Sequence, residues 1–156
     1  MNCTFISLED EVFTQFMNRI MQKIEHIGIA VNSLEKSIPL FEQLLGTLCY
    51  KTECVTSENV NTAFFKTGES KIELIEGIVE GSIIHQFIAK KGEGIHHIAF
   101  LTENLEEEIK RLKSLGFEFI QEIPKKGADN KLICFLKPKS TNGILVELCQ
   151  EISNQG

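Results

Sequence analysis

The stretch Gly92-Glu93-Gly94-Ile95-His96-His97-Ile98-Ala99-Phe100 places two adjacent histidines in an apolar, strand-like run. Side chains alternate between the two faces of a strand, so one histidine should face the concave side of a sheet and the other should not. A similar run occurs earlier, at Ile24-Glu25-His26-Ile27-Gly28-Ile29-Ala30-Val31. Aligning Ile27 with Ile98 places His26 opposite His97. We therefore expect His26 and His97 to occupy equivalent positions on two related strands, with His96 pointing away from the concave face.

Each of these runs begins a copy of the same pattern of elements. In the first copy, the strand at 23–31 precedes a helix that is capped by Asn32 or Ser33 and ended by Gly46. Strand-like segments follow at 47–56, 60–67 and 70–76. An internal repeat is better evidence for a fold than a single motif, so the second copy decides the prediction.

The second copy starts after a connector at 77–91, which is predicted to be helical from Ser82 to Lys90. A strand at 94–102 precedes a helix that Asn104 caps and Gly116 ends. Strand-like segments follow at 117–122, 131–137 and 143–150. We therefore predict an α+β fold in which two βαβββ modules form a curved, eight-stranded mixed sheet around a metal site.

The chain is predicted to hold one such domain, at residues 21–152, with module one at about 21–80 and module two at about 92–152. Residues 1–20 form an N-terminal extension. Ser7-Leu8-Glu9-Asp10 has the form of a capping box, and the apolar residues after it recur at helical spacing. This predicts a short amphipathic helix; the alternatives are a disordered tail, or a true start at Met21.

Charge and cysteine usage narrow the class of protein. The 156 residues carry a net charge of −6, which argues against a nucleic-acid partner because no basic surplus is present to neutralise phosphates. Five cysteines without a CxxC pair fit a reduced intracellular protein. No apolar run approaches the roughly 20 residues that span a bilayer. We therefore expect a cytoplasmic protein with no membrane association.

The fold predicts one cavity, lined by the inner faces of the first and last strands of each module. The polar residues expected on those faces are His26, Glu73, His97 and Glu147. His26 and His97 are 71 residues apart, and Glu73 and Glu147 are 74 apart, so the two pairs occupy nearly equivalent repeat positions. Two imidazoles and two carboxylates suit a divalent metal with open coordination positions, such as cobalt, manganese, nickel or zinc.

Each of these residues also has a simpler explanation. A histidine on an apolar strand is more often a hydrogen-bonded core residue, and a glutamate within a strand usually faces solvent. An ionised carboxylate among apolar side chains is costly, however, unless it is paired or bound to a metal. Four such residues at repeat-related positions favour the metal site.

The sequence resembles the vicinal oxygen chelate (glyoxalase/bleomycin resistance) superfamily and, within it, the methylmalonyl-CoA epimerases. The resemblance covers residues 22–151 and is carried by Ile24–Val31, Lys71–Ile75, Gly92–Phe100, Lys126–Lys131 and Lys137–Leu148. It implies metal ligands at His26, Glu73, His97 and Glu147. The implied activity is the metal-dependent interconversion of the R and S epimers of methylmalonyl-CoA, with an acyl-CoA as substrate; a homodimer is also expected.

Epimerisation removes a proton from the α-carbon and returns it on the opposite face, which requires two bases. The pseudo-twofold symmetry of the repeat favours Glu147 as one base and Glu73 as the other. Some relatives have a catalytic glutamate where this chain has Thr62, whose hydroxyl is no base at neutral pH, so the second base stays open. Lys137 and Lys139 are candidates for binding the nucleotide phosphates of CoA.

Two other functions fit this superfamily. A glyoxalase I-type lactoylglutathione lyase has a similar fold and also uses two histidines and two glutamates, but its members more often have a Pro-Asp-Gly turn where this chain has Pro138-Lys139-Ser140-Thr141-Asn142-Gly143. A non-enzymatic small-molecule binding or resistance protein usually lacks the complete ligand set. The four ligands and this turn favour the epimerase.

Overall fold

Two antiparallel strands, β1 (Lys23–Ala30) and β5 (Gly94–Leu101), lie at the centre of the sheet in the computed structural model, which describes residue 21 and residues 23–153. Beyond β1 come the parallel strand β4 (Ser70–Gly77), then β3 (Val60–Thr67) and β2 (Lys51–Val55). Beyond β5 come the parallel strand β8 (Val146–Glu151), then β7 (Lys131–Leu136) and β6 (Lys125–Lys126). The arrangement is the same on both sides of the centre, which confirms the predicted α+β fold of two βαβββ modules.

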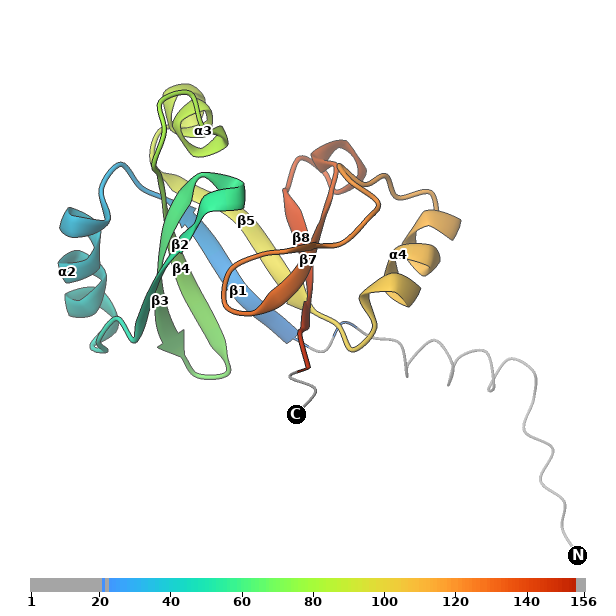
Figure 1. Cartoon of the computed structure of the whole chain (residues 1–156), viewed down its shortest axis with the longest axis horizontal. Helices are drawn as coiled ribbons and strands as arrows, with labels where there is room; N and C mark the ends of the chain where they lie inside the picture. Colours follow the sequence, from blue (N-terminus) through green and yellow to red (C-terminus); the bar gives the residue numbers. More distant parts are fainter. Residues whose placement is uncertain (1–20, 22, 154–156) are drawn as a thin grey trace, which may run out of the picture.

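Two equivalent helices, α2 (Leu34–Leu45) and α4 (Leu105–Ser114), lie outside the sheet at opposite ends of the molecule (Figure 1). The side chain of Ser33 caps α2 by accepting from Lys36 N, and Asn104 caps α4 by accepting from Glu107 N. These caps satisfy backbone N–H groups that a helix start otherwise leaves without a partner.

Each helix buries an apolar face against the outside of its own module. Leu34 of α2 belongs to a core cluster with Ala63, Phe65 and Leu74 of β3 and β4. The cluster under α4 joins the following buried residues: Leu105, Ile109, Leu112, Phe119, Cys134, Leu136 and Leu148. Because the cores lie on the outer side of the sheet, its concave side stays available for a cavity.

The third helix, α3 (Ile83–Lys91), connects the modules, and Ile84 packs with Ala30, Val55, Val60 and Ile75. Short 3-10 turns follow β2 (Thr56–Glu58) and β7 (Pro138–Ser140). No helix among the described residues is long and apolar enough to cross a membrane. The predicted helix in residues 1–20 lies outside the described residues.

The predicted strand at 117–122 is wrong. In that segment only Phe119 forms a bridge, with Leu136 of β7, through the bonds Ile120 N to Phe135 O and Lys137 N to Glu118 O. The chain then leaves the sheet: Ile123 is 81% exposed, and Pro124 has no N–H to donate. Pairing resumes at β6, so the apolar residues that predicted one strand are divided between a bridge and a loop.

Two β-bulges interrupt the central pairing of β1 with β5. Ile24 pairs with Phe100 and His26 with Ala99, which leaves Glu25 as an extra residue in β1. Gly28 pairs with His97 and Ile29 with Ile95, which leaves His96 as an extra residue in β5. A bulge re-aims the side chain of its extra residue. Glu25 and His96 both line the cavity, so the strict alternation predicted for these strands is wrong at these two residues.

Gly28 makes the central pairing sensitive to side-chain size. A Cβ atom added at Gly28 would overlap the His97 ring. Where the backbone accepts it without a clash, replacing glycine by alanine stabilises a protein by about 0.4–1 kcal/mol, whereas overpacking costs roughly 1–3 kcal/mol.

We therefore expect Gly28→Ala to lower the free energy of unfolding by roughly 1–3 kcal/mol, measured by urea denaturation of the metal-free protein. The control repeats the substitution in a His97→Ala background, where no ring meets the added methyl group and the loss should disappear. A Gly28→Ala protein at least as stable as wild type would show that His97 does not occupy the space above Gly28.

Candidate metal centre

A cavity of about 210 Å³ opens on the concave side of the sheet, between the two modules. Much of its wall is apolar, with Val55 and Val60 from module one and Ile133, Phe135 and Leu145 from module two. Such a wall excludes water and strengthens the interactions of the charged groups it surrounds. The polar residues at the floor of the cavity are therefore the candidates for chemistry.

The structure brings His26, Glu73, His97 and Glu147 together in this cavity, all four of them buried. Nε2 of His26 lies 2.9 Å from Nε2 of His97. The Oε2 atom of Glu73 lies 3.2 Å from His26 Nε2 and 3.7 Å from His97 Nε2. The Glu147 carboxylate lies 3.9 Å from His26 Nε2 through Oε1 and 3.6 Å from His97 Nε2 through Oε2. Both ring nitrogens thus face both carboxylates.

The strand registers explain this convergence. Glu73 on β4 pairs with Gly28, which lies two residues after His26 on β1. Glu147 on β8 pairs with Ala99, which lies two residues after His97 on β5. Side chains two residues apart share a face of a strand, so each carboxylate lies beside the histidine of its own module. The repeat therefore builds the same half-site twice, where a half-site is one histidine and one glutamate of a single module: His26 with Glu73, and His97 with Glu147.

Burial and neighbouring charges shift the pKa values of these groups. Burial lowers the pKa of His26, but hydrogen bonds with Glu25 and Glu73 raise it to about 10. Burial and the nearby His26 hold the pKa of His97 well below its usual value. Burial raises the pKa of Glu147 to about 8, against the opposing effect of His26. The raised pKa of Glu147 therefore indicates that His26 alone does not offset the burial of this carboxylate.

A divalent cation fits this set of donors. Among the described residues, no lysine or arginine forms an ion pair with Glu73 or Glu147, and the nitrogen atoms closest to their carboxylates are Nε2 of His26 and Nε2 of His97. The donor atoms of His26, His97 and Glu147 all lie within 4.8 Å of one another, which is close enough to share one ion. Neutral imidazole nitrogens and carboxylate oxygens suit first-row divalent metals.

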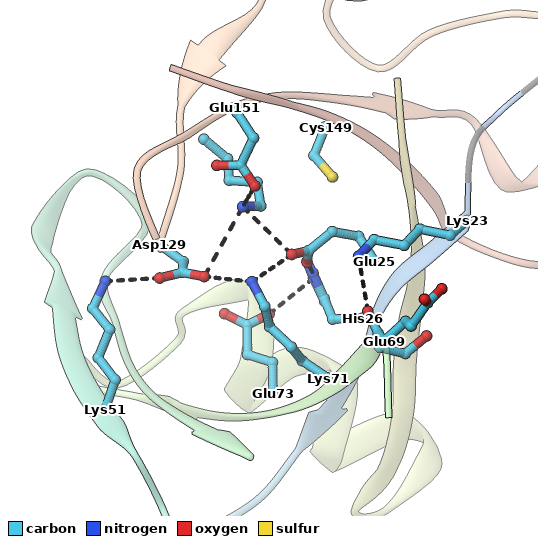
Figure 2. A network of polar contacts seen from close by, with 12 residues as sticks. Lys23, Glu25, His26, Lys51, Glu69, Lys71, Glu73, Asp129, Cys149 and Glu151 are labelled. Atoms are coloured by element: carbon cyan, nitrogen blue, oxygen red, sulfur yellow. Dashed lines mark hydrogen bonds and ion pairs between the residues drawn. The ribbon is translucent and has the colours of Figure 1, made fainter. Parts of the chain in front are cut away.

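Behind His26 lies a network of charged groups that sequence reasoning missed (Figure 2). The Oε2 atom of Glu25 lies 2.5 Å from His26 Nδ1, and its Oε1 atom accepts from Lys71 Nζ at 2.5 Å. Lys71 also donates to Asp129 Oδ2 at 2.6 Å. Burial raises the pKa of Glu25, but the bonds with His26 and Lys71 outweigh it and lower the pKa to about 2. Glu25 is thus a buried but ionised carboxylate.

The sequence carried two signals for this network. Glu25 directly precedes His26, and Asp129 belongs to the stretch Lys126–Lys131 that supports the family resemblance. Neither signal predicted contact with the site. Strict alternation along the strand would turn Glu25 away from the cavity, and Asp129 lies in a loop, where alternation predicts no direction for a side chain. The left-handed conformation of Asp129 and Asn130, with φ of 51° and 56°, forms the turn that brings Asp129 to Lys71.

The remaining predicted residues lie in different surroundings. Thr62 is buried in the cavity wall, and its hydroxyl donates to Glu53 O at 3.3 Å. Lys137 and Lys139 both form ion pairs with Glu118, outside the residues that line the cavity. The structure therefore joins the four predicted ligands but does not bring the two lysines to them.

Comparisons with known proteins identify the family and the relatives of this chain. A family model for the Glyoxalase/Bleomycin resistance protein/Dioxygenase superfamily matches residues 25–135. The chain is 42% identical over 135 residues to the uncharacterized protein YqjC of Bacillus subtilis, covering 86% of this chain and 96% of that one. It is 35% identical over 130 residues to the ethylmalonyl-CoA/methylmalonyl-CoA epimerase of Cereibacter sphaeroides, covering 82% and 97%.

Solved structures show the same relationship. The methylmalonyl-CoA epimerase from Mycobacterium tuberculosis superposes with a TM-score of 0.80 at 29% identity, over 83% of this chain and 88% of that one. The superfamily predicted from the sequence is confirmed, and so is the similarity to its epimerases. The chain belongs to the glyoxalase/bleomycin resistance protein/dioxygenase superfamily, and methylmalonyl-CoA epimerases are among its relatives.

Proposed function

We propose that this protein is a metal-dependent enzyme that interconverts the R and S epimers of methylmalonyl-CoA. The observation that carries the proposal is the convergence of His26, Glu73, His97 and Glu147 in one cavity, in a chain with named epimerases among its relatives. The Nε2 atoms of both histidines and the two carboxylates would hold one divalent ion: cobalt, manganese, nickel or zinc. That ion would act as a Lewis acid and stabilise negative charge on the thioester oxygen of the substrate.

The chain's own residues would move the proton. Glu147 and Glu73 lie on β8 and β4, which flank the central pair β1–β5 from opposite sides. Two carboxylates placed in this way can approach an α-carbon between them from opposite faces, as epimerisation requires. We assign removal of the α-proton to Glu147 and return of a proton on the opposite face to Glu73, which must already carry that proton; each carboxylate would loosen from the ion to do so. Thr62 is unsuited to either role because its hydroxyl is a weak acid that already donates to a backbone carbonyl.

The proposed substrate also suggests where its CoA part would bind. An acyl-CoA is the small-molecule partner, and Lys137 and Lys139 are candidates for binding its phosphates because both are cationic and partly exposed.

Two copies of the chain would associate. The exposed leucines at one end of the molecule, Leu40, Leu44 and Leu48 at 61–75% exposure, support such an interface. The site of action would be the cytoplasm, where the described cysteines, all free thiols, stay reduced.

The alternative function, that of a glyoxalase I-type lactoylglutathione lyase, can be distinguished with the metal-loaded protein. We expect this protein to exchange the α-proton of methylmalonyl-CoA with solvent deuterium, as followed by mass spectrometry. We expect it to leave the hemithioacetal of methylglyoxal and glutathione unchanged. A chelator should abolish the exchange and added cobalt should restore it. Isomerisation of the hemithioacetal without exchange would establish the lyase instead. Binding of either compound without turnover would indicate a non-enzymatic binding protein.

Glu147→Gln tests the assignment of the first base. The amide cannot accept the α-proton, so we expect the exchange rate to fall by roughly 10²–10⁴-fold, the usual contribution of a general base. Glu106→Gln, the same substitution on the exposed surface of α4, is the control and should leave the rate unchanged. Near-wild-type exchange in a Glu147→Gln protein that still binds metal would remove Glu147 from the mechanism.

A further inference from the structure

We propose that Glu25 and His96 are a matched pair of positioning residues, each of which orients one histidine of the metal centre through its Nδ1 atom. The proposal rests on the metal centre of the proposed function but not on the choice of substrate. It concerns the atoms behind the ligands, which determine where each ligand nitrogen points and which of the two ring nitrogens carries a proton.

The repeat itself pairs these two residues. With His26 aligned on His97, the residue before each histidine is Glu25 in module one and His96 in module two. Each is the extra residue of a β-bulge, one in β1 and one in β5. Because a bulge turns two successive side chains toward the same region, each precedes its histidine into the cavity rather than facing away. The same backbone irregularity thus occurs twice, at equivalent positions and beside equivalent ligands.

In module one the partner of the histidine is a carboxylate. An ionised carboxylate can only accept, so His26 Nδ1 donates to Glu25 Oε2, 2.5 Å away. A bound cation would replace the Nε2 proton of His26, and this atom faces His97, Glu73 and Glu147. Hydrogen bonds of this kind hold the ring and raise its basicity in known metal sites.

Glu25 is itself held in place by lysines. Lys71 Nζ lies 2.5 Å and Lys131 Nζ 3.4 Å from Glu25 Oε1. Lys71 continues to Asp129, which accepts from Lys51 at 3.0 Å (Figure 2). The network therefore connects β1 and β4 of module one with the β6–β7 loop and β7 of module two. The lysines hold the Oε1 atom of Glu25, and the Oε2 atom of the same carboxylate contacts His26 Nδ1.

In module two the partner is a second imidazole ring. His96 Nδ1 lies 3.0 Å from His97 Nδ1, and the His96 ring packs edge-on against Phe87 of α3, with centroids 5.0 Å apart. When His97 Nε2 binds a cation, its Nδ1–H must donate to His96 Nδ1, which accepts. A neutral imidazole is a weaker acceptor than a carboxylate. We therefore infer that the two positioning residues differ in strength, with Glu25 the stronger.

The test measures cobalt affinity, by competition with a chromophoric chelator, for the full chain. Glu25→Gln keeps the shape of the side chain but removes its charge, and it should weaken cobalt binding by roughly 10–100-fold, as removal of such partners does elsewhere. His96→Phe should weaken it by less, about tenfold or under. Glu25→Asp retains a carboxylate and should recover part of the loss.

Matched controls carry the same substitutions elsewhere. Glu108→Gln changes a buried carboxylate of α4 that pairs with Arg111, outside the network, and His85→Phe changes a partly buried histidine of α3. Both should bind cobalt as tightly as wild type. A spectroscopic readout separates positioning from general stability. In the cobalt protein, the Nδ1–H protons of His26 and His97 should give two paramagnetically shifted, solvent-exchangeable resonances. Glu25→Gln should speed solvent exchange of one and His96→Phe of the other.

The outcomes are distinguishable. Unchanged cobalt affinity in both Glu25→Gln and His96→Phe would overturn the positioning roles while leaving the metal centre and the proposed activity intact. Equal losses in the Glu108→Gln and His85→Phe controls would also overturn them, because the effect would then be one of stability. A wild-type chain that binds no cobalt, manganese, nickel or zinc would overturn the metal centre and this inference together.

Discussion

The antiparallel pairing of β1 with β5 is the constraint on which the structure depends. It joins the first strands of the two modules, so equivalent residues meet across the centre of one sheet. Each module then adds its last strand in parallel, β4 beside β1 and β8 beside β5. A metal site needs ligands from several directions, and this arrangement supplies one histidine and one carboxylate from each module. A shift of one residue in the central register would turn His26 and His97 to opposite faces.

The same arrangement forces charged groups into an apolar interior, which is costly unless each charge has a partner. Behind His26 the cost is offset within the chain, since Glu25 is bonded to His26 and Lys71, and Lys131 reaches both Glu25 and Glu151. In the cavity the carboxylates are less well compensated, because Glu73 and Glu147 face imidazoles rather than lysines. A divalent cation would supply the positive charge that these two carboxylates lack. The charges of the site and the positions of its donor atoms therefore both favour a metal ion.

Sequence reasoning could predict that His26, Glu73, His97 and Glu147 meet in one cavity, because repeat position and alternation define the face of a strand on which each of them lies. It could not predict the contacts of Glu25 and His96, because a single extra residue changes the face and nothing in the composition of either strand marks the bulge. The strand expected at 117–122 failed for a related reason: alternation of apolar residues does not show where backbone pairing stops. Asp129 depends on a turn with left-handed residues, and so lay beyond any periodic pattern.

The central claim is that these two half-sites share one divalent ion, and anomalous diffraction from crystals grown with cobalt tests it most directly. We expect one strong cobalt peak in the cavity, bonded to the Nε2 atoms of His26 and His97 and to carboxylate oxygens of Glu147 and Glu73, with Glu25 and His96 behind the rings. A crystal whose cobalt lies only on surface residues, with Nε2 of His26 still 2.9 Å from Nε2 of His97, would contradict it.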